Sequence, residues 1–233
     1  TSRRIIWGKS LNAGQTCVAP DHLLVENKLF NSLIANLKTS INSFYGTNPL
    51  SSDHYGSIIN QRQFNRLNNL LKQAKINNQI IYGGEFNESE KRISPTLIKI
   101  DNRKDQLMKE ELFGPLLPIL CIKNLDEAIS DLKSLPKPLA LYLFGGKEKE
   151  QEKMLSMTSS GGLCFNDVVL QAGIPELPFG GIGESGMGKY HGKAGFDNFT
   201  HYKSILKRPF WLDLNFRYPP YNLDLSLLKK LIG

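Results

Sequence analysis

Residues 12–20 place a cysteine at a sharp break in the chain, and this combination could support nucleophilic chemistry. Residues 3–11 carry apolar side chains at helical spacing, and Gly14 is typical of the end of a helix. Residues 23–25, Leu-Leu-Val, are typical of a buried strand. A thiol on such a turn lies near backbone N–H groups, which lower its pKa and stabilise an oxyanion. Cys17 is therefore a candidate nucleophile, although a single free cysteine is more often a small buried hydrophobe.

The residues around Cys17 are more informative than the cysteine itself. Gly-Gln-Thr-Cys-Val-Ala-Pro, residues 14–20, resembles the nucleophile signature of aldehyde dehydrogenases, specifically of the class 3 branch that includes the fatty aldehyde dehydrogenases. Four further segments resemble motifs of the same branch and occur in the same order. They are Lys-Glu-Glu-Leu-Phe-Gly-Pro at 109–115, Gly-Gly-Leu-Cys-Phe-Asn-Asp at 161–167, the run from Leu-Pro-Phe-Gly-Gly to Tyr-His-Gly-Lys at 177–193, and Arg-Tyr-Pro-Pro-Tyr at 217–221. These ordered matches cover most of the chain.

This resemblance implies the oxidation of aromatic or medium- to long-chain aliphatic aldehydes to carboxylic acids, with NAD or NADP as cofactor. The Cys17 thiolate would attack the aldehyde carbon and form a thiohemiacetal, whose oxyanion the backbone N–H of Cys17 and an upstream side-chain amide would hold. Hydride transfer to the cofactor would leave a thioester for water to hydrolyse. Covalent catalysis of this kind divides one difficult step into two easier ones.

The resemblance also assigns roles to five other side chains. Glu111 matches the carboxylate that binds the ribose hydroxyls beside the nicotinamide, and Phe113 matches the aromatic residue that packs near the nicotinamide. Trp7, Phe179 and His191 match positions that line the aldehyde pocket. From residue type alone, the simpler interpretations are a solvated glutamate, core aromatic residues and a histidine with a structural hydrogen bond.

Other residues with chemical potential have weaker functional interpretations. Asn166 either hydrogen-bonds near the site or holds a turn, while Cys121 and Cys164 lie in strand patterns and are expected in the core. Residues 181–186 match G-x-G-x-x-G, the sequence motif of dinucleotide-binding loops, but they follow a Pro-Phe-Gly turn instead of a strand. We expect these glycines to form a tight loop close to the active site. No metal site is predicted.

Helical and strand patterns alternate along the chain. The pattern predicts an α/β fold, with a largely parallel, helix-covered sheet as in the aldehyde dehydrogenase catalytic domain. The expected helices cover 27–46 (with Asn27 as its cap), the region of 64–74, 126–134, 147–157 and the region of 189–196, and the expected strands cover 80–82, 97–100, 116–122, 139–144, 162–165 and 200–206.

We divide the chain into a catalytic domain at 1–199, an oligomerisation strand at 200–208 and a C-terminal tail at 209–233. The resemblance implies that the strand pairs with a partner subunit in a homodimer. Residues 223–232 form a short amphipathic pattern, which is too short to span a bilayer. We expect it to pack on the body or on a partner, with peripheral membrane contact as the alternative.

Bulk composition excludes several classes of function. The 233 residues are 40% hydrophobic and 22% charged, which is ordinary for a globular domain. The net charge is +7, but basic and acidic residues alternate without a basic run, so nucleic acid is not an expected partner. Three cysteines do not suggest a disulfide framework, and no secretory signal or long apolar run opens the chain. The expected location is the cytoplasm, with membrane association as the alternative.

Parts of the family pattern lie outside this sequence. The family places its cofactor-binding domain upstream of the nucleophile, together with the general-base glutamate and the asparagine of the oxyanion hole. Residue 1 is Thr, which suggests a piece of a longer protein or a processed product. We therefore expect a partial enzyme that is inactive alone. The alternatives are a non-catalytic truncated product that dimerises or binds partners, and a membrane-associated basic module.

Overall fold

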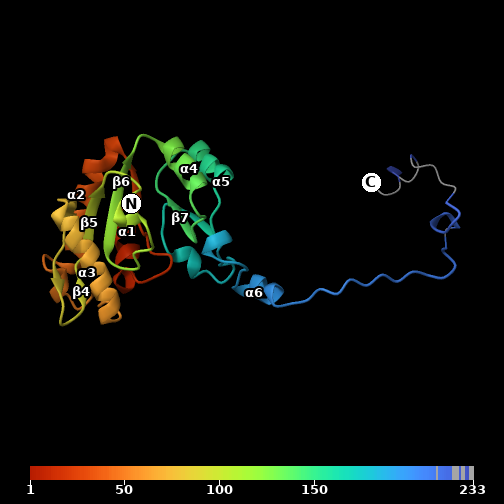
Figure 1. Ribbon diagram of the computed structural model, residues 1–233, viewed down its shortest axis with the longest axis horizontal. Helices are drawn as coiled ribbons and strands as arrows, with labels where there is room; N and C mark the ends of the chain where they lie inside the picture. The colour runs from red at the N-terminus through yellow and green to blue at the C-terminus, as the bar shows by residue number, and fades with distance from the viewer. Residues whose placement is uncertain (214, 222–225, 227–228, 231–233) are drawn as a thin grey trace. The chain divides into compact units, whose positions relative to one another are not determined.

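The structure is a computed structural model that describes residues 1–213, 215–221, 226 and 229–230. Its contacts divide the chain into two units, Thr1–Phe199 and Thr200–Gly233, which are considered separately. The first unit contains the elements predicted from the sequence, and most bounds agree within one or two residues (Figure 1). Its helices are α1 (Ser2–Ser10), α2 (Phe30–Tyr45), α3 (Gln61–Ile76), α4 (Leu125–Ser134), α5 (Glu148–Met157) and α6 (Gly192–Asn198). Its strands are β1 (Leu23–Glu26), β2 (Ile80–Tyr82), β3 (Phe86–Asn87), β4 (Arg92–Ile93), β5 (Thr96–Ile100), β6 (Leu116–Ile122), β7 (Ala140–Leu143) and β8 (Gly162–Phe165).

A four-stranded sheet with the order β1-β6-β5-β2 forms the centre of the first unit. Strands β1, β6 and β5 are parallel, and β2 joins the edge of β5 in the antiparallel direction. Because successive side chains of a strand point to opposite faces, Leu116 and Leu120 pack toward α3, whereas Leu117 and Ile119 pack toward α1 and α2. The expected α/β sheet, largely parallel and covered by helices, is confirmed, and the helices lie on both of its faces.

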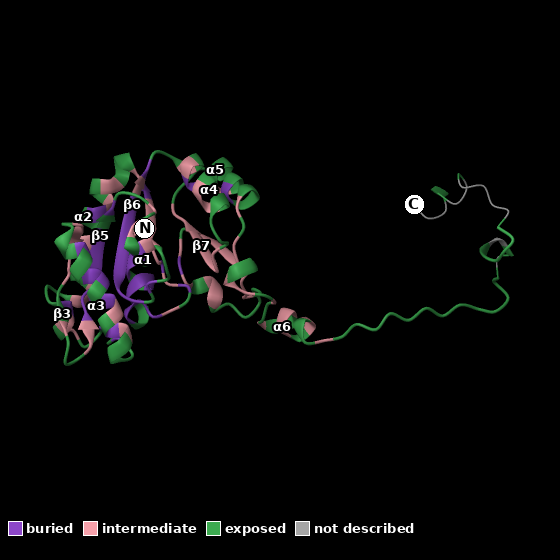
Figure 2. Ribbon diagram, in the orientation of Figure 1, coloured by how far each residue is buried: buried purple, intermediate pink, exposed green. Residues whose placement is uncertain are grey.

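A second, smaller sheet pairs β7 with β8 in parallel. Every residue of these two strands is half-buried, whereas almost every residue of β5 and β6 is buried. Figure 2 shows this contrast as purple strands in the first sheet and pink strands in the second. Helices α4 and α5 lie side by side near this sheet and are joined by an ion pair between Lys153 and Asp126.

Asparagine caps begin two of the helices. The side chain of Asn60 accepts a hydrogen bond from the backbone N–H of Gln63 at the start of α3, and Asn124 does the same for Glu127 in α4. The predicted cap at Asn27 is wrong, because residues 27–29 form a 3₁₀ turn and α2 begins at Phe30 without a side-chain cap. The end of α2 is as predicted: Gly46 adopts a φ of 73°, which favours glycine.

The described residues of the second unit have little regular structure. Residues 200–209 form neither helix nor strand in this single chain, so the strand predicted at 200–206 is absent here. A strand is stable only where its backbone groups pair with those of a neighbouring strand. Pairing with another subunit stays a prediction. The amphipathic helix predicted at 223–232 lies mostly outside the described residues.

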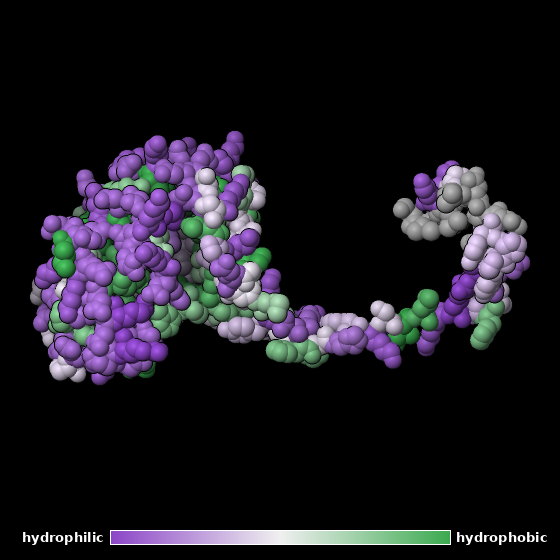
Figure 3. Space-filling view, viewed as in Figure 1, coloured by the Kyte–Doolittle hydropathy of each residue, from purple (hydrophilic) through white to green (hydrophobic). Residues whose placement is uncertain are grey.

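The surface of the first unit is mainly hydrophilic on the face that Figure 3 shows. Within the described residues, no helix combines the length and the apolar character that crossing a membrane requires.

Candidate functional site

The turn that carries Cys17 is built from three consecutive residues in the left-handed region. Asn12, Ala13 and Gly14 have φ values of 52°, 53° and 78°. Glycine is required at the third position, because a methyl group there would overlap the carbonyl oxygen of Gly114. The backbone therefore reverses abruptly after α1, and the thiol of Cys17 is exposed at the end of this reversal.

The side chain of Gln15 fixes this turn to the body of the protein. Its Nε2 donates to the carbonyl oxygens of Asn12 at 2.9 Å and Ser57 at 3.0 Å. Its Oε1 accepts from the backbone N–H of Ile59 at 2.8 Å. Gln15 is buried, so these bonds are made away from bulk water and hold the loop two residues before the thiol in one conformation.

Cys17 lines a cavity of about 560 Å³. The other lining residues are mainly apolar and come from the Cys17 turn, from the segment after β8 and from the pair Phe179 and Tyr190. They are Thr16, Val18, Val169, Leu170, Ala172, Gly173, Ile174, Phe179 and Tyr190. A nucleophilic atom at the wall of an apolar cavity is an arrangement that suits covalent chemistry on an apolar substrate.

The wall that faces Cys17 follows strand β8. Its backbone contains two further left-handed residues, Asn166 at a φ of 59° and Val169 at a φ of 67°. The side chain of Asn166 accepts from the backbone N–H of Gly145 at 2.8 Å, so its role in the structure is to hold a turn. Val168 is fully buried against α1, where a Cβ on Gly8 would collide with its side chain.

Phe179 and Tyr190 complete the cavity wall as an isolated antiparallel bridge. Their backbones exchange two hydrogen bonds, of 2.9 and 2.8 Å, and their rings pack edge to face with centroids 5.3 Å apart. The ring of His191 packs edge to face against that of Tyr190, with centroids 4.6 Å apart, and its Nδ1 lies 3.2 Å from the carbonyl oxygen of Leu177. Phe179 thus lies on the cavity with Cys17, whereas His191 adjoins that wall.

Trp7 and His191 are not among the cavity-lining residues of the described part of the chain. Trp7 lies on α1 and is 39% exposed. The loop at 181–186 is a tight turn, as predicted, in which a Cβ on Gly181 would overlap the carbonyl oxygen of Ser185. It contains a 3₁₀ turn and does not follow a strand, so the G-x-G-x-x-G motif is not the loop of a β-α-β unit.

Glu111 and Phe113 flank a residue whose backbone is clamped from two sides. The N–H of Leu112 donates to Asp21 Oδ1 at 2.9 Å, and its carbonyl oxygen accepts from the guanidinium of Arg66. Leu112 itself is fully buried. Phe113 has a φ of 47° and a ring that is 40% exposed, so the clamped segment presents a carboxylate and an aromatic ring to solvent on either side of Leu112.

A buried lysine lies in the electrostatic field of the same segment. Lys9, on α1, is 2% exposed, and burial lowers its pKa to about 8, although the charges of Asp21 and Glu111 oppose this shift. Burial and the charge of Asp21 raise the pKa of Glu111, and Lys9 and Arg66 oppose them. For Asp21, burial is outweighed by the hydrogen bond with His22, the charge of Lys9 and the N–H of Leu112, and the pKa is lowered.

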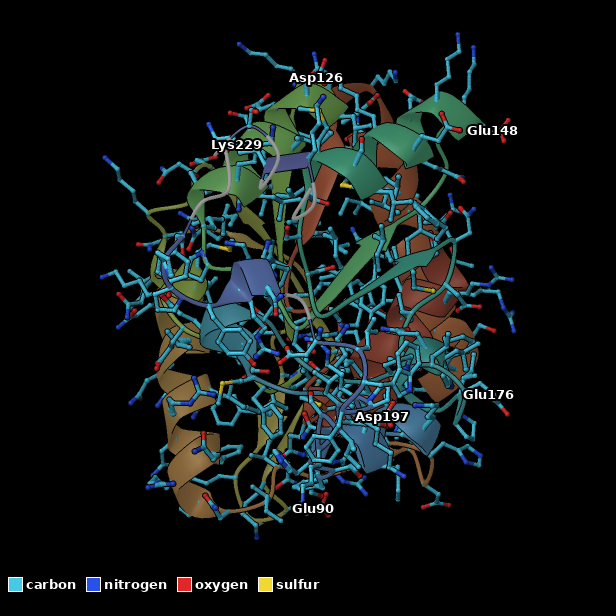
Figure 4. All side chains as sticks on the ribbon, turned by 90° about the vertical axis from the view of Figure 1, so that its right-hand side faces the viewer. Glu90, Asp126, Glu148, Glu176, Asp197 and Lys229 are labelled. Atoms are coloured by element: carbon cyan, nitrogen blue, oxygen red, sulfur yellow. The ribbon has the colours of Figure 1, made fainter. Side chains whose placement is uncertain are left out.

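This charged group differs from the acidic residues of the first unit that Figure 4 labels. The labelled side chains of Glu90, Asp126, Glu148 and Glu176 lie at the periphery of Figure 4. Asp21, in contrast, is partly buried and accepts a backbone hydrogen bond. Within the part of the chain that the structure describes, no three His, Cys, Asp or Glu side chains are arranged to hold a metal ion.

Sequence reasoning missed Lys9, Asp21, Tyr142 and Tyr190. Lys9 follows an apolar helical pattern and so suggests a solvated helix end. Asp21 follows Pro20 and suggests turn punctuation. One signal was available: Lys9 lies in the last turn of α1 and Asp21 lies just before β1, so the two charges are at the ends of the turn that joins these elements.

Together, the fold and the site define a class: an α/β protein in which a sharp, immobilised turn presents a thiol to an apolar cavity. The model of the aldehyde dehydrogenase family matches residues 1–205. An aldehyde dehydrogenase of Craterostigma plantagineum is 46% identical and aligns with 94% of this chain and 46% of its own length. The dimeric, NADP-preferring aldehyde dehydrogenase of Canis lupus familiaris is 44% identical over 94% of this chain and 48% of its own.

Among solved structures, the substrate-bound state of Staphylococcus aureus AldH matches the whole chain with a TM-score of 0.89 and 42% identity. The match covers 50% of that protein, so this chain spans about half the length of each of these three relatives. The chain belongs to the aldehyde dehydrogenase family.

Proposed function

We propose that this chain supplies the nucleophile, the aldehyde-binding wall and part of the cofactor site of a class 3-like, NAD(P)-dependent aldehyde dehydrogenase. One observation carries the proposal: Cys17 sits exposed on a turn fixed by Gln15 and faces an apolar cavity of about 560 Å³. A fixed turn reduces the entropy lost when the thiol and the aldehyde carbon are brought together.

In the proposed reaction, the Cys17 thiolate adds to the aldehyde carbon, and the carbonyl π electrons move to the oxygen. The backbone N–H of Cys17 stabilises this oxyanion. A nicotinamide cofactor, which Glu111 and Phe113 would hold, would supply the hydride acceptor that oxidation of the thiohemiacetal to a thioester requires. Attack of water on the thioester, with loss of one proton from the water to solvent or to a base, forms the carboxylic acid and releases the thiolate. Apolar walls keep stray water from the acyl group until that step.

The substrate class follows from the lining of the cavity. Val169, Leu170, Ile174 and the aromatic pair Phe179 and Tyr190 offer apolar surface and edge-to-face packing. These walls suit an aromatic or a medium- to long-chain aliphatic aldehyde. We keep Trp7 and His191 as candidate contacts for the outer part of such a substrate.

Residues that would hold the cofactor fit that role in their chemistry. Glu111 offers a carboxylate that accepts two hydrogen bonds, as the two hydroxyls of a ribose require. Phe113 offers an exposed ring for stacking, and the clamp of Asp21 and Arg66 on Leu112 fixes the spacing between the two side chains. Because only these two side chains of the chain are assigned to the dinucleotide, we propose that the chain alone does not turn over aldehyde.

The C-terminal segment has a proposed role in assembly. Residues 200–208 form neither helix nor strand in this chain, their local pattern is that of a strand, and the dog relative is a dimeric enzyme by name. We propose that this segment pairs with a strand of a second subunit to form a homodimer.

The test uses this chain joined to the upstream half of the dog relative. Formation of NADH or NADPH is measured with an aromatic and a long-chain aliphatic aldehyde, for the joined protein and for the 233-residue chain. We expect turnover by the joined protein, no steady turnover by the chain alone, and loss of turnover by at least about a thousandfold in Cys17→Ala, the size typical of a lost nucleophile.

Cys121→Ala and Cys164→Ala are the matched controls, because both remove a partly buried thiol that does not line the cavity. They should retain most of the turnover. Turnover that survives Cys17→Ala would contradict the role of Cys17, and steady turnover by the chain alone would contradict only the need for the upstream half.

A further inference from the structure

Tyr142 connects the two walls of the cavity through one hydroxyl group. It lies on β7, opposite Cys164 of β8. Its hydroxyl donates to the carbonyl oxygen of Val18, the residue after the nucleophile, at 2.7 Å. The same oxygen accepts from the backbone N–H of Val169 at 3.1 Å and from the side-chain amide of Gln171 at 2.9 Å.

These three bonds use the whole hydrogen-bonding capacity of a phenol, which has one donor and two acceptor lone pairs. The donor fixes the Cys17 turn, and both acceptors fix the segment that faces it. Val18 is 3% exposed, so its carbonyl group has little access to water as an alternative partner.

The bond to Val169 holds a residue whose backbone conformation is unfavourable. It is a β-branched residue with a φ of 67°, a conformation that β-branched side chains rarely adopt and that costs free energy. Its side chain lines the cavity. The bond from its N–H to Tyr142 is one of the interactions that keep this strained residue in place.

Tyr142 is also close enough to Cys17 to interact with it electrostatically. Burial raises the pKa of Tyr142, the hydrogen bonds with Gln171 and Val169 oppose this shift, and the neighbouring thiols of Cys164 and Cys17 add to it. The hydroxyl therefore stays protonated at neutral pH and remains able to donate to Val18.

We propose that Tyr142 is a positioning residue that sets the distance between the Cys17 thiol and the apolar wall at Val169 and Leu170, and so the selectivity of Cys17 for apolar electrophiles. It acts through Val18 and Val169 and does not touch the reacting atoms. This inference rests on the proposed function of Cys17. It goes further by naming what holds the substrate wall against the nucleophile.

The experiment compares two thiol reagents on the 233-residue chain. N-phenylmaleimide carries an aromatic ring that needs the wall, and iodoacetamide is small and does not. The alkylation rate of Cys17 is followed by peptide mass spectrometry, with Cys121 and Cys164 as internal references. The measured quantity is the ratio of the two rates, because a general change in exposure or thiol pKa alters both rates together.

In Tyr142→Phe, which removes all three bonds, we expect this ratio to fall at least about fivefold. In Gln171→Met, where one of the three bonds is lost, we expect a fall of about twofold. Tyr55→Phe is the matched control, because the Tyr55 hydroxyl also donates to a backbone carbonyl, that of Ile93, at 2.7 Å but lies in the core. Its ratio should equal that of the unmodified chain.

An unchanged ratio in Tyr142→Phe, or an equal fall in Tyr55→Phe, would overturn the inference. If circular dichroism shows that Tyr142→Phe does not fold, Gln171→Met decides by the same criterion, and an unchanged ratio there overturns it. A failure of the proposed function gives a different result: Cys17 of the unmodified chain would then react no faster than Cys121 and Cys164 with either reagent.

Discussion

The two regions that meet at the cavity are built in different ways. The turn of Cys17 rests on the β1-β6-β5-β2 sheet, whose strands and covering helices α1, α2 and α3 form two clusters of buried apolar side chains. The facing wall rests on the β7-β8 pair, in which every residue is half-buried. There, order comes from hydrogen bonds such as those of Tyr142 and from left-handed residues such as Val169.

This difference separates the two requirements of the site. The nucleophile needs one fixed position, and the hydrogen bonds of Gln15 to a densely packed body supply it, because close-packed side chains leave little room for gradual deformation. A substrate wall must match ligands of different shape. A wall held by a small number of hydrogen bonds can be altered by single substitutions without loss of the core. Matched substitutions in the two regions test this difference.

The largest difference is expected from truncation of one phenylalanine in each region. Phe64 of α3 is fully buried in the core, whereas Phe165 of β8 is half-buried. Phe64→Ala should lower the free energy of unfolding by about 3–5 kcal/mol, because it removes apolar contacts and leaves a cavity. Phe165→Ala should lower it by about 1–2 kcal/mol, in proportion to the smaller buried area. Urea unfolding measures both values, and equal losses would show that the two regions are equally packed.

The next effect concerns the two glycines that end the elements beside the site. Gly14 and Gly145 have nearly equal φ values, 78° and 80°. A methyl group on Gly14 would overlap Gly114, but one on Gly145 would meet no atom within 4 Å. Gly145→Ala should therefore cost about 1 kcal/mol, the conformational strain alone. Gly14→Ala should cost about 3 kcal/mol, because steric overlap is added to that strain.

Urea unfolding of the two glycine variants checks this prediction, and peptide mass spectrometry after alkylation reports on Cys17. We expect only Gly14→Ala to alter the rate at which Cys17 reacts. If Gly145→Ala costs as much as Gly14→Ala, steric contact at the turn is not what fixes the nucleophile.

Much of the first region could be predicted from the sequence because its signals are local. Leu116 to Ile122 is a continuous apolar run, which buried parallel strands require, and Phe64, Leu67 and Leu71 repeat at helical spacing. That Cys17 and Phe179 line the same cavity could be predicted only from the family resemblance. The two residues are 162 positions apart in the sequence, and no periodicity links them.

The rest could not be predicted because it depends on long-range contacts and on tertiary burial. Tyr142 in a strand pattern indicates a half-buried aromatic side chain, and nothing local shows that its hydroxyl reaches Val18. Lys9 suggests a solvated charge until the fold places α1 against the body of the unit. Residues 200–206 fit a local strand pattern but form no strand in this chain, because a strand also needs a neighbouring strand to pair with, which a local pattern does not reveal.

The smallest effect tests the cost of burying Lys9 in the first region. Burial lowers its pKa from 10.5 to about 8 in the folded chain. Between these two pH values the unfolded chain binds more protons than the folded chain, so the free energy of unfolding rises with pH. We expect a gain of about 2 kcal/mol between pH 8 and pH 10 in the unmodified chain relative to Lys9→Met, since one pKa unit corresponds to about 1.4 kcal/mol. Urea unfolding at several pH values measures this difference, in which the titrations of tyrosine and cysteine cancel.

Lys75→Met, which removes an exposed lysine at the end of α3, should keep the slope of the unmodified chain. If Lys9→Met shows that same slope, burial does not lower the pKa of Lys9, and the core beside the nucleophile turn does not carry the cost of a buried lysine.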